Sequence, residues 1–137
     1  MTRVSVLIAE DHKEMRENIR RVLEPEFEVV GAVADGQALI AEATRIDPDV
    51  LLVDISMPAP DGIKAVTQLR KLGSTARVVF LTVEEDPNWV RAALRAGGLG
   101  YVIKMSMAAE LQTAIRDACA GRIFVSPSIR FSLRTPN

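Results

Sequence analysis

Five polar side chains each follow a short apolar run of the sequence. They are, in chain order, Glu10, Asp11, Asp54, Thr82 and Lys104. Short apolar runs bounded by polar residues are typical of buried parallel strands. In open α/β sheets, ligands bind outside the carboxyl ends of such strands. We therefore expect the five side chains to meet at one edge of a sheet and to form a single site around Asp54.

The expected site contains three carboxylates, from Glu10, Asp11 and Asp54. Neighbouring carboxylates raise one another's pKa unless a cation neutralises them. Oxygen ligands without a thiolate or an imidazole favour Mg²⁺, which also binds phosphate oxygens. The Thr82 hydroxyl and the Lys104 ammonium are groups that a phosphoryl oxygen needs for hydrogen bonding and charge neutralisation. Asp54 is then left as a nucleophile that accepts a phosphoryl group as an acyl phosphate.

Each of these residues also has an ordinary structural explanation when taken alone. An acidic residue after a strand is commonly a helix cap, which applies to Asp11 and to Asp54. Thr82 fits plain strand composition, and Lys104 fits a solvated surface charge. Their joint occurrence at strand ends favours the site over these separate explanations.

The elements that must position the site alternate along the chain. Strands are predicted over residues 3–9, 27–33, 50–54, 77–81 and 99–103, each followed by a helical pattern. Asp61, Asp86-Pro87 and Ser106 are expected to begin three of the helices. Alternating strands and helices predict an α/β fold, because parallel neighbours need crossover helices. We expect a flavodoxin-like, doubly wound, five-stranded parallel sheet of order 2-1-3-4-5 with five helices.

Residues 1–121 account for this whole fold and are expected to form one domain. Residues 122–137 contain no evident sixth strand and are interpreted as a C-terminal extension or a truncated linker. Ile129, Phe131 and Leu133 fit a short amphipathic helix there, and a frayed tail fits equally well.

The composition says more about the cellular compartment of the protein than about its binding partners. A net charge of −1 gives no overall attraction to nucleic acid or to an anionic membrane. Cys119 is the only cysteine, so an internal disulfide is excluded. We expect its side chain to be a buried thiol. The apolar run that ends at Ala9 is too short for a signal peptide core or a membrane span. A soluble, cytoplasmic protein is expected.

Several local motifs together resemble one family. They are Val6–His12, Val53–Pro58 with Asp61-Gly62, Leu81-Thr82, Ala96-Gly97 and Gly100–Lys104. Over residues 3 to about 121, the chain closely resembles the receiver domain of bacterial two-component response regulators. Such a domain is a signalling module that catalyses only its own phosphotransfer and dephosphorylation, with a sensor histidine kinase as its partner.

The resemblance implies a role for each site residue. Asp54 is the phosphoacceptor, and Thr82 and Lys104 contact the phosphoryl group. Mg²⁺ is implied as the cofactor, held by Glu10, Asp11, Asp54 and the backbone carbonyl of Ser56. Thr82 and Tyr101 are implied to form the switch that alters the surface made by the fourth helix, fifth strand and fifth helix.

Some positions depart from the commonest receiver pattern. Glu10 replaces a frequent aspartate, and its longer side chain should still reach the metal. Val83 stands where a small residue is frequent, and its bulk either packs or slows loss of the phosphoryl group. Ser56 and Glu84 are further candidates for tuning the phosphoryl lifetime. Met105 replaces a frequent proline, so a cis peptide after Lys104 is not expected.

Other local matches indicate a subgroup. The chain resembles receivers that precede a LuxR-type helix-turn-helix domain at Asp11-His12, at Tyr101–Lys104 without a following proline, and at Gly121-Arg122 leading to Val125–Pro127. This predicts control of a DNA-binding output domain in a longer regulator, with no nucleic-acid or membrane binding by this chain itself. A homodimer formed on phosphorylation is a further expected partner.

Three other classes of protein are alternatives to a phosphorylated receiver with a DNA-binding output. A phosphatase with an aspartyl intermediate would need a second aspartate where Ser56 stands. A flavin-binding protein would need a phosphate loop where Glu10 and Asp11 would repel phosphate. A stand-alone or phosphorylation-independent receiver that acts through protein contacts remains the main alternative.

Overall fold

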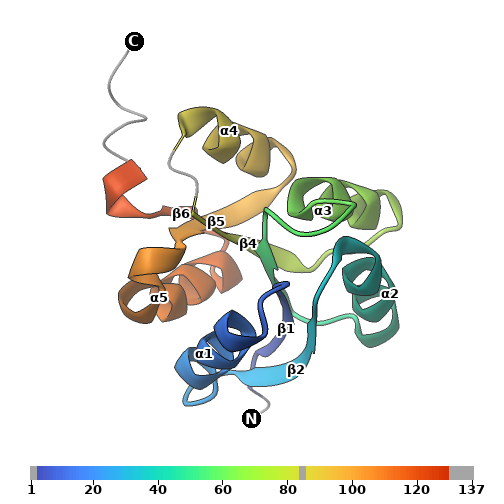
Figure 1. The fold of residues 1–137 in the computed structure, drawn as a ribbon, viewed down its shortest axis with the longest axis horizontal. Coiled ribbons are helices and arrows are strands. Elements are labelled where there is room, and N and C mark those ends of the chain that lie inside the picture. The colour runs from blue at the N-terminus through green and yellow to red at the C-terminus, as the bar shows by residue number, and fades with distance from the viewer. Residues whose placement is uncertain (1–2, 84–85, 130–137) are drawn as a thin grey trace.

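A parallel sheet with helices on both faces forms the structure, a computed structural model that describes residues 3–83 and 86–129 (Figure 1). The strands are β1 (Ser5–Ala9), β2 (Glu28–Val33), β3 (Val50–Asp54), β4 (Arg77–Thr82), β5 (Gly98–Ile103) and β6 (Phe124–Val125). The helices are α1 (Lys13–Leu23), α2 (Gly36–Ile46), α3 (Gly62–Lys71), α4 (Pro87–Arg95) and α5 (Met107–Cys119), with a 3₁₀ turn at Lys104–Ser106.

The strand order is β2-β1-β3-β4-β5-β6, and every pair is parallel. The predicted flavodoxin-like fold and the order of its first five strands are confirmed. β1 and β3 are neighbours although β2 separates them in the chain, so the direction of winding reverses beside them. This reversal opens the crevice in which ligands of doubly wound sheets bind.

Alternate residues of the central strands feed two separate hydrophobic cores. In β3, Leu51 and Val53 pack in the core under α2, α3 and α4, whereas Val50 and Leu52 pack in the core under α1 and α5 (Figure 1). Both faces of the strand are therefore buried, which explains why its sequence is continuously apolar. The strand ends where Asp54 replaces this pattern at the sheet edge.

Two of the predicted helix caps are confirmed and one is wrong. Asp61 accepts a hydrogen bond from the Lys64 amide, and Asp86 accepts one from the Asn88 amide. Ser106 makes no capping hydrogen bond with its side chain. A 3₁₀ turn precedes α5, so Ser106 has φ −102° and ψ 5° instead of the extended conformation of an N-cap residue.

The prediction that no sixth strand follows residue 121 is wrong. β6 pairs with β5 through Gly100 with Phe124 and Tyr101 with Val125. Ile129, beyond β6, is fully buried in the core that α4 covers. Residues 122–129 are thus not a frayed tail, while Phe131 and Leu133 lie outside the described residues.

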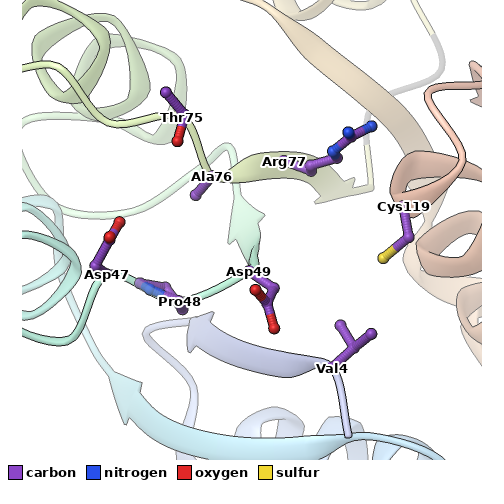
Figure 2. Close-up of a pocket in the computed structure, with 8 residues that line it drawn as sticks. All are labelled: Val4, Asp47, Pro48, Asp49, Thr75, Ala76, Arg77 and Cys119. Atoms are coloured by element: carbon purple, nitrogen blue, oxygen red, sulfur yellow. The ribbon is translucent and has the colours of Figure 1, made fainter. Parts of the chain in front are cut away.

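Cys119 and a cavity lie at the other end of the sheet. The prediction of a buried thiol is wrong, because Cys119 is exposed at the end of α5. Its side chain lines a cavity of about 390 Å³ with Asp49 and Arg77, which stand at the amino-terminal ends of β3 and β4 (Figure 2). This cavity is therefore separate from the carboxyl edge where Asp54 lies. None of the helices in the described residues has the length and apolarity that a membrane span requires.

Gly62 allows α3 to begin directly against the end of β3. A Cβ atom on Gly62 would lie 2.4 Å from the backbone oxygen of Asp54 and 3.0 Å from the Cα of Ile55. Both atoms are backbone and cannot move without shifting the strand end. We expect Gly62→Ala to lower the free energy of unfolding by about 1–3 kcal/mol, measured by urea denaturation. Lys64→Ala, at an exposed position of the same helix, is the control and should change it by less than about 0.5 kcal/mol. Equal stability of the Gly62 variant and the native chain would contradict the close approach.

Candidate functional site

The ends of four strands bring the predicted residues to one edge of the sheet. Ala9 pairs with Val53, so Glu10 lies beside the end of β3 that carries Asp54. Asp54 pairs with Leu81, directly before Thr82, and Thr82 pairs with Ile103, directly before Lys104. The parallel register alone therefore places these groups in one row.

Lys104 joins two of the carboxylates. Its Nζ lies 2.6 Å from Oε1 of Glu10 and 3.2 Å from Oδ2 of Asp54. The Lys104 side chain is only 12% exposed and each carboxylate only 1%. The ammonium thus neutralises part of a buried negative charge that would otherwise be strongly unfavourable.

The environment separates the acidities of Glu10 and Asp54. Burial raises the pKa of Glu10, but the Lys104 ammonium and the His12 amide outweigh it and lower this pKa to about 2. Burial and the charge of Glu10 raise the pKa of Asp54 to about 6, against the opposing effects of Lys104 and the Ser56 amide. Two carboxylates that share one cation commonly titrate apart in this way. At neutral pH both are ionised, and Asp54 is the more basic of the two.

Asp11 extends the acidic group away from the sheet. Its Oδ1 lies 3.2 Å from Nδ1 of His12, and Oε1 of Glu10 contacts Nζ of Lys104 at 2.6 Å. Ligand atoms of Glu10, Asp11 and His12 lie within 4.8 Å of one another. A cluster of carboxylate oxygens that includes the buried Oε1 of Glu10 and Oδ1 of Asp11 fits a hard divalent cation such as Mg²⁺.

Two residues near this acidic group were not predicted as site residues. His12 donates its amide to Oε2 of Glu10 at 3.1 Å, and Arg16 donates a guanidinium N–H to the Glu10 backbone oxygen at 2.8 Å. Both orient Glu10 from the start of α1. The adjacency of His12 to Asp11 was the only sequence signal for these contacts.

The loop after β3 fixes the Asp54 carboxylate. The Ser56 amide donates to Oδ1 of Asp54 at 3.0 Å, while Oδ2 contacts Lys104. The Ile55 amide donates to the Leu81 carbonyl, and the Gly62 amide donates to the Ile55 carbonyl. Oδ1 of Asp54 is consequently held by a loop that is itself anchored to β4 and α3, and Oδ2 is held by Lys104.

The proposed switch residues are both buried, and their neighbour is not. Thr82 and Tyr101 have no exposed surface, whereas the Val83 side chain is 67% exposed. Val83 therefore does not serve core packing, and Glu84 lies outside the described residues. Among the described peptide bonds, only Ala59–Pro60 is cis, so the expectation for the bond after Lys104 is confirmed.

Known proteins resemble this chain in sequence and in fold. Residues 6–116 match the response regulator receiver domain family. The nitrate/nitrite response regulator NarP of Escherichia coli is 37% identical over 97% of this chain and 63% of its own length. A two-component response regulator of the LuxR family from an Aurantimonas species superposes with a TM-score of 0.90 at 32% identity, covering 95% of this chain and 94% of that one.

The RcsB response regulator of Salmonella typhimurium has a TM-score of 0.91 at 29% identity, covering 99% of this chain and 69% of that one. RcsB has also been solved as dimers bound to DNA.

A doubly wound parallel sheet with acidic side chains and a lysine at its carboxyl edge is the architecture of a signalling receiver. This chain belongs to the response regulator receiver domain family. Its relatives include LuxR-family regulators. The chain spans 56 to 63% of the length of the curated relatives it matches.

Ionisation of Asp54 should reduce the stability of the metal-free protein. The pKa of Asp54 is about 6 in the folded state, against 3.8 for an ordinary aspartate. The folded state therefore binds more protons between these pH values, and its stability falls as the pH rises through them. Asp54→Asn removes this titration. The free energy of unfolding of the native chain should therefore fall more steeply than that of the variant. We expect the difference between the two to change in favour of the variant by more than about 1 kcal/mol from about pH 5 to about pH 7.5.

The measurement is urea unfolding of both proteins at the two pH values, with a chelator present. Glu10 does not interfere, because its lowered pKa confines its contribution to the range below 4.5. Parallel stability curves for the two proteins would show that Asp54 is not perturbed in this way.

Proposed function

We propose that this chain accepts a phosphoryl group from a sensor histidine kinase on Asp54, with Mg²⁺ as cofactor, and then changes the surface made by α4, β5 and α5. The observation that carries the proposal is the pair of contacts from Lys104 Nζ to Glu10 and Asp54. It supports a site in which one carboxylate is oriented, buried and ionised beside a fixed cation.

In the transfer step, a carboxylate oxygen of Asp54 forms a bond to phosphorus. The bond from phosphorus to the nitrogen of the kinase histidine breaks, and its electron pair stays on that nitrogen. The Asp54 pKa of about 6 leaves the nucleophile ionised at neutral pH. The Lys104 ammonium balances negative charge on the phosphoryl oxygens, and the Thr82 hydroxyl is the hydrogen-bond donor for one of them. Burial of the site strengthens both contributions.

Glu10, Asp11, Asp54 and the backbone carbonyl of Ser56 are the groups that would hold Mg²⁺. The ion, when bound, supplies further neutralisation of the phosphoryl charge. The close grouping of carboxylate oxygens from Glu10 and Asp11, with Oε1 of Glu10 and Oδ1 of Asp11 buried, supports this assignment.

The switch follows from the register of β4 and β5. Phe80 pairs with Tyr101 and Thr82 pairs with Ile103, so movement of Thr82 toward a phosphoryl group acts on the strand that carries Tyr101. Trp89 on α4 and Met105 after β5 are partly or largely exposed apolar side chains on the surface in question. A shift between two packings of Tyr101 would change how this surface binds partners.

The output is a DNA-binding domain in a longer regulator, with phosphorylation favouring a homodimer. The partial coverage of the relatives and the RcsB dimers on DNA support this part of the proposal. A phosphorylation-independent receiver is disfavoured, because the strand register supports a meeting of Glu10, Asp54, Thr82 and Lys104 at the sheet edge. A stand-alone receiver that is phosphorylated and acts through protein contacts is the alternative to this output.

The phosphotransfer is tested by labelling with a small-molecule phosphodonor. We expect Mg²⁺-dependent incorporation on Asp54, lost in Asp54→Asn and on addition of a chelator. Asp61→Asn is the matched control, because asparagine also caps helices and this residue only begins α3. Full labelling of the Asp54 variant, located by peptide mass spectrometry, would overturn the assignment.

Val83 should slow hydrolysis of the acyl phosphate, because its exposed side chain follows Thr82 and obstructs the approach of water to Asp54. We expect Val83→Ala to shorten the half-life of the phosphorylated chain about threefold, less than about 1 kcal/mol of activation free energy. Loss of label from purified phosphoprotein measures this rate. Leu72→Ala, also an exposed aliphatic residue, is the control. An unchanged half-life in the Val83 variant would remove this role.

A further inference from the structure

The segment of residues 124–129, here the C-terminal segment, is joined to the strand that leads into the phosphoryl site. It contains β6 and a helical turn at residues 127–129, and it lies beside β5 (Figure 1). The Ser126 amide donates to the Tyr101 carbonyl at 2.9 Å. The family match ends at residue 116, so this attachment lies outside the common receiver domain.

Ser126 makes the attachment specific. Its hydroxyl is fully buried, accepts a hydrogen bond from the Ile103 amide at 2.9 Å and donates one to Oε1 of Glu110 on α5 at 2.5 Å. The side chain thereby continues the pairing of β5 beyond the two residues of β6. Removal of the Ser126 hydroxyl would leave the buried Ile103 amide without its hydrogen-bond acceptor, which is unfavourable.

Ile103 directly precedes Lys104 in the chain. The hydrogen bond from Ser126 therefore fixes the backbone from which Lys104 reaches Glu10 and Asp54. Val125 and Ile129 also belong to the same buried core as Tyr101, on the face covered by α4. The C-terminal segment thus contacts Tyr101 and the residue that directly precedes Lys104, both on β5.

We propose that Ser126 is a positioning residue for the phosphoryl site, and that docking of the C-terminal segment and occupation of Asp54 stabilise each other. The proposal rests on the proposed function and adds a coupling between that site and the C-terminal segment. The coupling is reciprocal: a site that prefers Lys104 in its fixed position also favours the docked segment.

Hydrogen exchange on the native chain tests the coupling without any substitution. Beryllofluoride with Mg²⁺ serves as the probe for a phosphorylated Asp54, and its binding is followed by fluorescence of Trp89, the only tryptophan. We expect the Ile103 and Ser126 amides to exchange about fivefold more slowly with the probe bound, measured by NMR. The Glu28 amide, bonded to the Val4 carbonyl at the far edge of the sheet, is the control for global stabilisation. Slowing of all three amides by the same factor would overturn the coupling.

Substitution tests the reverse direction. Ser126→Ala should raise the beryllofluoride concentration needed for half-saturation about fivefold, and Ser126→Thr, which keeps the hydroxyl, should recover most of the affinity. Ser128→Ala is the matched control, because Ser128 is exposed two residues away. Equal affinity of Ser126→Ala, Ser128→Ala and the native chain would refute the positioning role. If Ser126→Ala fails to fold, the exchange measurement alone decides.

The two hypotheses fail differently. A native chain that binds beryllofluoride and is labelled on Asp54, but shows no selective protection of the Ile103 and Ser126 amides, refutes only the coupling. A native chain that neither binds the probe nor takes up label refutes the proposed function, and the coupling with it.

Discussion

The contact of one lysine with two buried carboxylates is the constraint on which the rest of the site depends. Glu10 and Asp54 are nearly inaccessible to solvent, and the Lys104 ammonium lies within 3.2 Å of both. Removing one partner of a buried ion pair typically costs about 3–5 kcal/mol, because the remaining charge is left unpaired. The arrangement fixes Asp54 beside a cation, as the nucleophile of the proposed phosphotransfer would need to be.

The parallel sheet is what brings these charges together at low conformational cost. The groups come from the ends of β1, β3 and β5, which are largely buried strands. A hydrogen bond from the Ser56 amide fixes Oδ1 of Asp54, and Lys104 contacts Oδ2. A site built in this way has little freedom to relax when one charge changes. A change of charge at Asp54 must therefore be answered by movement of the less constrained neighbours, of which Thr82 and β5 are the nearest along the register.

The sequence was sufficient for the fold and for the positions of the site residues, because both follow from long apolar runs with abrupt polar ends. Features that depend on single contacts were not predictable in the same way. β6 has only two residues, too few for a periodic pattern, and it exists because Val125 and Ile129 find a core to fill. Ser106 has the right residue type for a cap, but the preceding 3₁₀ turn gives it the wrong backbone conformation. Cys119 is exposed because α5 ends there, a boundary that composition does not reveal.

β5 pairs with β4 on one side and with the short β6 on the other, and the Ser126 side chain stabilises its carboxyl end. On one side it pairs with β4, whose last residue is Thr82, the residue proposed to respond to a phosphoryl group. On the other side it pairs with a strand too short to hold it by backbone hydrogen bonds alone. The Ser126 hydroxyl accepts one directional hydrogen bond from the Ile103 amide. This single bond is weaker than a series of backbone hydrogen bonds between strands, and it can therefore respond to the state of Lys104. A longer β6 would hold β5 more firmly, but it would also make the docking of residues 124–129 less sensitive to the charge at Asp54.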